Sequence, residues 1–171
     1  MIQVRWKDAT PMGLLQLARA LVLALPVPVI VNDRVDVALA AGAAGAHLGQ
    51  DDPPLDALRS EVPPGFLLGI SVGSVAEAER VRAWPADYWS VGPCFATGNK
   101  PDAGIALGPQ GFSTLARRAP EGLPVIGIGG ITATTAAEIV RGGAVGVAVM
   151  GAVLGAADPE AAAGALWAAM R

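Results

Sequence analysis

Three polar side chains alternate with apolar ones at the start of the chain. In MIQVRWKD, Gln3, Arg5 and Lys7 occupy the odd positions, and apolar residues fill the even ones between them. A strand points successive side chains to opposite faces, so a strand here places an amide, a guanidinium and an ammonium group on one face. Two cations at this spacing suit a bound phosphate polyanion. The alternative is an edge strand whose polar face lies in water.

Two acidic clusters follow other short apolar runs. Asn32 and Asp33 come directly after VIV, and Asp51 and Asp52 come directly after HLGQ. Mg²⁺ binds through one or two carboxylates and completes its shell with substrate phosphate oxygens, so Asp33 and Asp52 are the expected Mg²⁺ ligands. The alternatives are local ones: Asp33 could be the N-cap of a helix starting at Arg34, and Asp51, which is followed by Asp52 and two prolines, could be a turn residue.

Glycine-rich segments and a long loop end the remaining apolar runs. GIGGIT, at residues 127–132, is read as a glycine turn into a helix, where backbone N–H groups could hold a phosphate. Together with MGAVLGA, at residues 150–156, it lies where TIM barrels commonly bind phosphate, after the last two strands. The other interpretation of GIGGIT is a tight left-handed turn without a ligand. Ser71 follows a further run, and the loop GPCFATGNKPDAG contributes Thr97, Asn99 and Lys100.

The chain has one histidine and one cysteine, and neither is predicted to be a nucleophile or a base. His47 lies within an apolar run, and no carboxylate or nucleophile is placed to form a triad with it. Cys94 has no metal-ligand spacing around it, and a single cysteine excludes an intrachain disulfide. Both are therefore expected to be core residues.

These polar groups can form one site only if the fold brings the ends of the strands together, and the hydrophobic pattern predicts such a fold. Seven short aliphatic runs alternate with helical patterns, at residues 2–5, 28–31, 45–48, 66–70, 87–91, 124–128 and 146–150. Alternating strands and helices predict a parallel sheet covered by helices, with the active site in the loops after the strands. No dinucleotide-binding GxGxxG motif is present, which favours a (β/α) barrel. We expect an α/β fold, a single TIM barrel domain over residues 1–171. A TIM barrel has eight strands and only seven runs are found here, so we expect the first β/α unit to be lacking.

Composition excludes several classes of partner. The 171 residues are 53% hydrophobic and 16% charged, with a net charge of −3 and no basic tract, which argues against nucleic acid binding. The longest apolar stretch, residues 20–31, contains two prolines and is too short to span a bilayer, so no membrane partner is expected. The single cysteine fits a cytoplasmic protein, and an exposed strand edge favours a homo-oligomer.

In this order, the motifs resemble those of the thiamine-phosphate synthase family. The resemblance runs from Gln3 to about Pro159 and rests on QVRWKD, VIVNDRVDVALA, GAHLGQDD, GISVGS, GPCFATGNK, PVIGIGGIT and VAVMGAVLGAADP. It implies a TIM barrel that joins a hydroxymethylpyrimidine pyrophosphate to a thiazole phosphate and releases pyrophosphate. It also implies a dissociative mechanism that depends on Mg²⁺ and needs no protein nucleophile.

The resemblance assigns roles by position. It implies that Gln3 contacts the pyrimidine, that Arg5, Lys7, Asn32, Ser71 and Lys100 make the catalytic contacts to pyrophosphate, that Asp33 and Asp52 bind Mg²⁺, and that Thr97, Asn99, Gly129, Gly130, Met150 and Gly151 bind the thiazole phosphate. The chain departs from the family at three of the quoted positions. Gly73 stands where relatives often have His or Thr, Asn99 replaces a Thr, and Gly151 replaces a common Ser.

Two other functions remain open. A thiazole tautomerase, an isomerase of the same superfamily, resembles this chain at GISVGS and VAVMGA, but its working histidine would fall at Gly73. Such relatives also tend to lack the Asn-Asp pair and the complete Q-x-R-x-K motif. The second alternative is a non-catalytic protein that binds thiazole phosphate or thiamine phosphate. The absent first strand and Asn99 favour it, whereas the retained aspartates oppose it.

Overall fold

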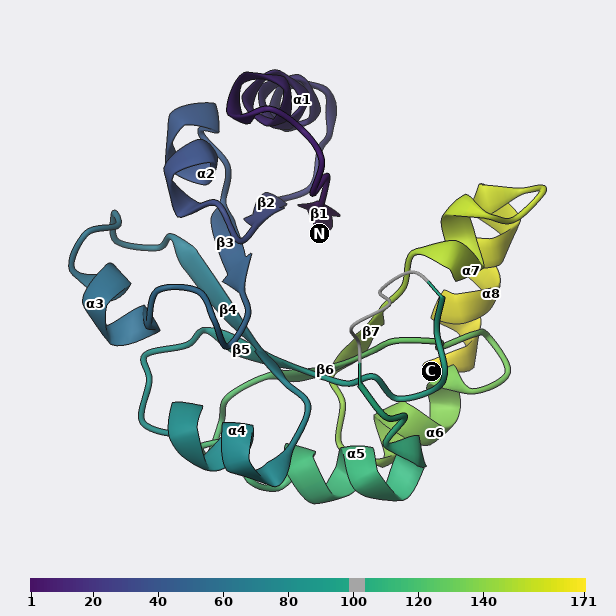
Figure 1. Cartoon of the computed structure of the whole chain (residues 1–171). Helices are drawn as coiled ribbons and strands as arrows, with labels where there is room; N and C mark the ends of the chain where they lie inside the picture. The colour runs from purple at the N-terminus through teal and green to yellow at the C-terminus, as the bar shows by residue number, and fades with distance from the viewer. Residues whose placement is uncertain (99–103) are drawn as a thin grey trace. The chain divides into compact units, whose positions relative to one another are not determined.

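The computed structural model describes residues 1–98 and 104–171, so Asn99 and Lys100 lie outside the described residues. The strands, shown in Figure 1, are β1 (Ile2–Val4), β2 (Val29–Asn32), β3 (Gly45–Leu48), β4 (Leu67–Val72), β5 (Tyr88–Val91), β6 (Val125–Ile128) and β7 (Gly146–Ala148). The helices are α1 (Pro11–Ala24), α2 (Val35–Ala41), α3 (Leu55–Arg59), α4 (Val75–Val81), α5 (Gly108–Ala116), α6 (Ala136–Arg141), α7 (Gly151–Leu154) and α8 (Pro159–Ala169). All seven predicted strands are present, within two residues of the expected bounds.

The strands follow one another in chain order within the sheet, from β1 to β7. The pairs with a defined register, β1–β2, β2–β3, β3–β4, β5–β6 and β6–β7, are all parallel. A helix follows each strand, which is the connection that parallel strands require. The predicted α/β class is therefore confirmed. Within the described residues, no helix combines the length and the apolar character needed to cross a membrane.

Contacts along the chain define two compact units, which are described separately below. The first comprises Met1–Ser71 and Trp84–Asp87, and the second comprises Val72–Ala83 and Tyr88–Arg171. The first unit holds β1 to β3, nearly all of β4, and the helices α1 to α3. The second holds β5 to β7 and the helices α4 to α8. The single domain over residues 1–171 stays a prediction.

In the first unit, the strand register separates an apolar face from a polar one. Val4, Val31 and Ala46 are register partners across β1, β2 and β3, and all three are buried. Helices α1 and α2 pack on each other and on β2 (Figure 1). Side chains on the other face are one position out of step, and they include Gln3 and Asn32. The same alternation that builds the core therefore places polar groups together opposite it.

In the second unit, a close helix–strand contact holds β6 in place. Trp89 of β5 and Phe112 of α5 are fully buried. Gly127 of β6 is buried, and a Cβ atom added there would collide with the Cγ2 atom of Ile139 in α6. Helix α6 therefore approaches the strand as closely as a glycine permits, which fixes the position of the turn that follows β6.

Candidate functional site

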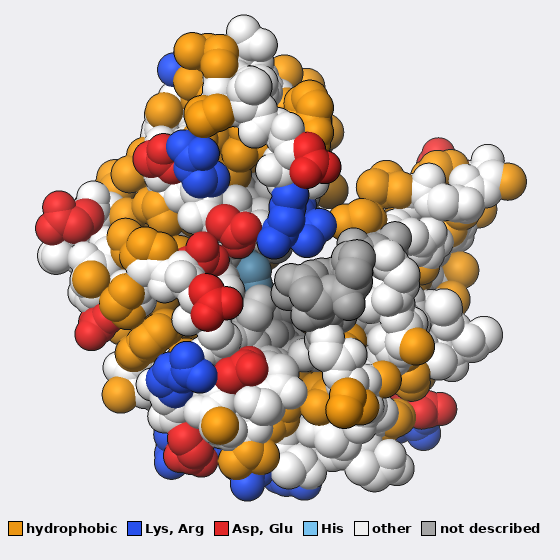
Figure 2. All heavy atoms as spheres, viewed as in Figure 1, with side chains coloured by type: hydrophobic (Ala, Val, Ile, Leu, Met, Phe, Trp, Pro, Cys, Tyr) orange, Lys and Arg blue, Asp and Glu red, His pale blue; other side chains and the backbone are white. Residues whose placement is uncertain are grey.

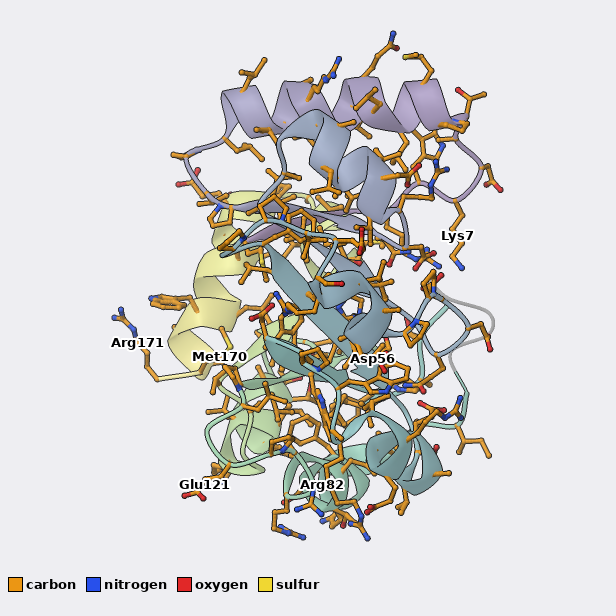
Figure 3. All side chains as sticks on the ribbon, turned by 90° about the vertical axis from the view of Figure 1, so that its left-hand side faces the viewer. Lys7, Asp56, Arg82, Glu121, Met170 and Arg171 are labelled. Carbon is orange, nitrogen blue, oxygen red and sulfur yellow. The ribbon has the colours of Figure 1, made fainter. Side chains whose placement is uncertain are left out.

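The cationic side chains of the first unit lie at the end of β1. Arg5 directly follows the strand and is half-buried, and Lys7 is exposed. Because Val4 pairs with Val31, Arg5 and Asn32 are the next positions along their strands and share a face. Lys7 extends from the segment between β1 and α1 (Figure 3), and basic and acidic side chains lie beside one another on the face shown in Figure 2. The structure thus places Arg5, Lys7 and Asn32 at one end of neighbouring strands.

Asp33 occupies an unusual backbone conformation at the end of β2. Its φ angle is 62°, the only positive value among the described residues that are not glycine. The N–H of Arg34 donates to the carbonyl of Asn32 at 2.7 Å, which closes a three-residue turn centred on Asp33. The Asp33 N–H donates to the His47 carbonyl at 2.8 Å. Such strained turns concentrate at functional sites, where the surrounding structure holds them.

The alternative role of Asp33 as a helix N-cap is wrong. Helix α2 begins at Val35, its N-cap residue is Arg34, and no side chain caps it. The guanidinium of Arg34 instead pairs with Asp36, with 2.8 Å between Arg34 Nε and Asp36 Oδ1. The Asp33 carboxyl group is therefore not used to start the helix.

The carboxyl groups of Asp33 and Asp52 meet in the first unit. Burial and then the charge of Asp52 raise the pKa of Asp33, with a smaller contribution from hydrogen bonding to Asp52, and the charges of Lys7 and Arg5 only partly offset this. Asp52 Oδ2 also accepts the Gly49 N–H at 2.7 Å, which holds the carboxyl group against the end of β3. Two carboxyls, one of them disfavoured as an anion, face two cationic side chains.

The donor set fits a hard divalent cation. Two adjacent carboxylates repel each other until a cation or a proton neutralises them, and carboxylate oxygens are the ligands that Mg²⁺ prefers. Among the described residues, no cluster of three or more His, Cys, Asp and Glu side chains could hold a metal. An ion at Asp33 and Asp52 would therefore complete its shell with water or substrate oxygens, as Mg²⁺ does.

Ser71 is held by two residues of the first unit. His47 Nε2 lies 2.9 Å from Ser71 Oγ, and Gln50 Nε2 donates to the Ser71 carbonyl at 2.5 Å. His47 is buried, as predicted, with 5% of its surface exposed. The sequence did not reveal its contact with Ser71. The available signal was strand parity, because both residues had to lie on the same face of neighbouring strands.

In the second unit, the glycine turn after β6 has a conformation that only glycine accepts there. Gly129 and Gly130 have φ angles of 90° and 64°. An added Cβ would lie 2.8 Å from Pro93 Cα at Gly129, and 2.5 Å from the Ala96 carbonyl oxygen at Gly130. The Phe95 N–H donates to the Gly129 carbonyl at 2.9 Å. The turn therefore packs directly against the loop after β5.

The N–H groups of Gly129 and Gly130 donate no backbone hydrogen bond to another described residue. The predicted left-handed turn is confirmed, but the predicted direct entry into a helix is wrong, because α6 begins only at Ala136. Met150 is the N-cap of α7 and Gly151 is its first residue, after the neighbouring strand β7. Thr97 follows the loop segment that packs on Gly130.

The fold and the site together define a class of protein. Parallel strands in chain order, each followed by a helix, carry their polar groups and glycine turns directly after the strands. That arrangement is the (β/α)-barrel architecture, and the residues that the structure describes contribute seven strands to it.

Comparison with known proteins gives the family. A family model described as thiamine monophosphate synthase matches residues 1–153, and the chain belongs to this family. Thiamine-phosphate synthases from Roseiflexus castenholzii and Roseiflexus sp. RS-1 are 51% and 49% identical to the chain, each over 96% of it, and the matches span 73% and 70% of those relatives. The solved thiamine phosphate pyrophosphorylase from Pyrococcus furiosus is 34% identical, with a TM-score of 0.85 over 98% of this chain and 81% of that one.

Proposed function

We propose that the chain is a Mg²⁺-dependent thiamine-phosphate synthase, a transferase that joins a hydroxymethylpyrimidine pyrophosphate to a thiazole phosphate. The observation that carries the proposal is the contact between the Asp33 and Asp52 carboxyls beside Lys7 and Arg5. This arrangement combines a cation site with two positive side chains, which suits a departing pyrophosphate. The family membership and its named relatives support the same activity.

The proposed reaction exchanges one bond for another. The bond between the exocyclic methylene of the pyrimidine and the pyrophosphate oxygen breaks, and the pyrophosphate leaves with the electron pair. The thiazole nitrogen then forms the new bond to that methylene carbon. When bound, Mg²⁺ supplies positive charge that stabilises the leaving pyrophosphate.

The chain's own residues bind and orient the two substrates in this proposal. Arg5 and Lys7 neutralise the charge that develops on pyrophosphate, and Ser71 and Asn32 donate hydrogen bonds to it. Gln3 contacts the pyrimidine. In the second unit, the N–H groups of the glycine turn hold the thiazole phosphate, together with Thr97, Met150 and Gly151. Asn99 and Lys100 remain predicted contacts, since they lie outside the described residues.

The packing around Gly73 argues against the tautomerase alternative. A Cβ atom at this position would lie 3.0 Å from the Gly92 carbonyl oxygen, which is tighter than ordinary van der Waals contact. The Gly73 N–H donates to Glu77 Oε2 at 2.7 Å, which fixes the backbone here. A histidine at this position would require the Gly92 carbonyl to give by a few tenths of an ångström.

The deciding experiment measures thiamine phosphate formation from both substrates, with and without Mg²⁺. The wild-type chain is compared with Asp52→Asn, and with Asp51→Asn as the control, because Asp51 is the exposed neighbouring carboxylate. We expect Mg²⁺-dependent product that falls at least a hundredfold in Asp52→Asn and stays near wild type in Asp51→Asn, in line with loss of an electrostatic contact. Binding of thiazole phosphate without any product would instead support the non-catalytic alternative. Cytoplasmic location and a homo-oligomeric state stay predictions.

A further inference from the structure

His47 links two parts of the pyrophosphate site in the first unit. Its backbone carbonyl accepts the Asp33 N–H at 2.8 Å, and its Nε2 lies 2.9 Å from Ser71 Oγ. The register pairs His47 with Gly69, so Ser71 lies on the same face, two positions further toward the end of β4. Only 5% of the His47 surface is exposed, so the ring is largely enclosed by the protein.

We infer that His47 is a positioning residue that sets the direction of the Ser71 hydroxyl hydrogen. Its Nε2 carries a hydrogen and donates it to Ser71 Oγ, so the Ser71 O–H is free to donate to the pyrophosphate. The inference rests on the proposed function, because it assigns Ser71 to that ligand. No proton is transferred and no covalent bond changes.

The reason is the limited donor capacity of a hydroxyl group. A serine has one O–H donor and two acceptor lone pairs, whereas a neutral imidazole nitrogen either donates or accepts. If Nε2 accepted, the single hydroxyl hydrogen would point to the ring and Ser71 would present lone pairs to an anion. If Nε2 donates, the hydroxyl donates onward, and each bond of the chain polarises the next.

The main chain of Ser71 is anchored separately, so His47 affects only the direction of the Ser71 hydroxyl hydrogen. Gln50 Nε2 donates to the Ser71 carbonyl at 2.5 Å, so the main chain is anchored independently of His47. A hydrogen bond to a charged group contributes about 1.5–3 kcal/mol in mutational series. Losing the correct hydroxyl orientation should therefore weaken pyrophosphate binding by about ten- to a hundredfold.

The first test reads the tautomer directly. The chain contains a single histidine, so an untagged protein labelled with ¹⁵N-histidine gives the NMR signals of one imidazole ring. With MgCl₂ and inorganic pyrophosphate present, we expect Nε2 to carry a hydrogen. A ring whose Nε2 is unprotonated would overturn the inference. Because this test needs no substitution at His47, a variant that fails to fold does not affect it.

The second test is a double-mutant cycle, read out as the affinity for inorganic pyrophosphate with Mg²⁺ by calorimetry. His47→Leu and Ser71→Ala should each weaken pyrophosphate binding about tenfold or more. His47→Gln retains an N–H donor and should therefore keep most of the wild-type affinity. In the Ser71→Ala background, His47→Leu should have no further effect. Additive losses, or equal losses in His47→Gln and His47→Leu, would show a purely structural role.

The wild-type measurement separates this inference from the proposed function. If the wild type binds pyrophosphate with Mg²⁺ but the cycle is additive, only the role of His47 fails. If the wild type binds no pyrophosphate at all, the proposed function fails, and the inference fails with it.

Discussion

The Asp33 and Asp52 carboxyl groups lie close enough together for Asp52 to raise the pKa of Asp33, although one belongs to the turn after β2 and the other to the segment after β3. The backbone N–H of Asp33 donates to the His47 carbonyl, and the Asp52 carboxyl accepts the Gly49 N–H. Two acidic groups brought together in this way disfavour full ionisation. The pair is therefore prepared for a cation and is destabilising without one.

This relationship predicts that Asp33→Asn stabilises the protein while it abolishes catalysis. The pKa of Asp33 is raised in the folded state, so folding binds the proton more tightly, and stability falls as the pH rises above the ordinary value of 3.8. Asparagine cannot ionise and therefore removes this unfavourable contribution at neutral pH. Asparagine also tolerates a positive φ angle. We expect the melting temperature to rise by about 1–3 °C without Mg²⁺.

The same variant should respond less to the metal. A ligand that binds only the folded state raises its stability, so MgCl₂ should raise the melting temperature of the wild type more than that of Asp33→Asn. Calorimetric melting at pH 7 and at pH 4 checks both statements. Equal gains from Mg²⁺ in the two proteins would contradict the assignment of Asp33 as a ligand.

Arg5 and Lys7 are predicted to act unequally on the pyrophosphate substrate. Arg5 is half-buried and able to make a two-point contact, so Arg5→Lys should reduce kcat/KM about ten- to a hundredfold although the charge is kept. Lys7 is exposed, so Lys7→Gln should reduce kcat/KM less than Arg5→Lys does, mainly by raising KM. Added salt should reduce the difference between Lys7→Gln and the wild type. Steady-state kinetics at low and high ionic strength tests this. Arg82→Gln is the control, because Arg82 is the C-cap residue of α4 and takes no part in the site.

Gly130→Ala should damage the thiazole-phosphate site specifically. Alanine would adopt a φ of 64° and place its Cβ 2.5 Å from the Ala96 carbonyl oxygen, so the turn must move. We expect a loss of about 2–4 kcal/mol in the free energy of unfolding. If the variant folds, KM for thiazole phosphate should rise, while pyrophosphate affinity, which depends on the first unit, stays near wild type.

Gly122→Ala is the matched control for this substitution. Its φ angle of 78° is also positive, but no atom lies within 4 Å of an added Cβ. Gly122→Ala should lower the free energy of unfolding by only about 1–2 kcal/mol, the cost of the left-handed backbone alone. Denaturant unfolding of both variants separates backbone strain from the steric effect, and equal losses would show that the contact with Ala96 is unimportant.

Cys94 is predicted to be inert and to make stability depend on alkaline pH. Burial raises the pKa of its thiol from 9.0 to about 11, against a smaller lowering by a backbone hydrogen bond from Ile128. Between these values the unfolded chain loses its proton and the folded chain keeps it, so stability should fall as the pH rises above about 9. Denaturant unfolding at pH 8 and 10 measures this, and Cys94→Ala should show a smaller fall.

Native-state labelling tests the same burial independently. At pH 8, thiol reagents should modify Cys94 no faster than the protein unfolds. The thiol is buried, and it reacts only as the thiolate, which burial disfavours. Rapid modification under native conditions would show that the thiol is exposed.

Most strands could be predicted from sequence because they are short, mainly apolar runs bounded by glycine, proline or polar residues, and β1 could be predicted from its alternation of polar and apolar residues. The order of polar groups after them was predicted as well, since the carboxyl ends of parallel strands meet at one edge. The prediction at Asp33 was less complete, because an aspartate before a helix suggests an N-cap, whereas the turn here needs a positive φ that no local pattern specifies.

Two further features depended on contacts that sequence spacing does not encode. His47 was correctly placed in the core, but its bond to Ser71 requires the register between β3 and β4. The helix after GIGGIT starts late because threonines intervene, and Thr135 Oγ1 accepts the Thr132 N–H at 3.0 Å before α6 begins. Side-chain bonds of this kind compete with helix formation.

The three-residue turn at Asp33 also has a consequence for how this protein can change by mutation. An aspartate codon becomes an asparagine codon by one base change, and asparagine fits the left-handed backbone at least as well. Selection for a more stable fold would therefore favour asparagine at this position, and only selection for the activity would maintain aspartate. In a gene copy that is no longer under selection for the activity, Asp33 should be replaced early, while the fold stays intact.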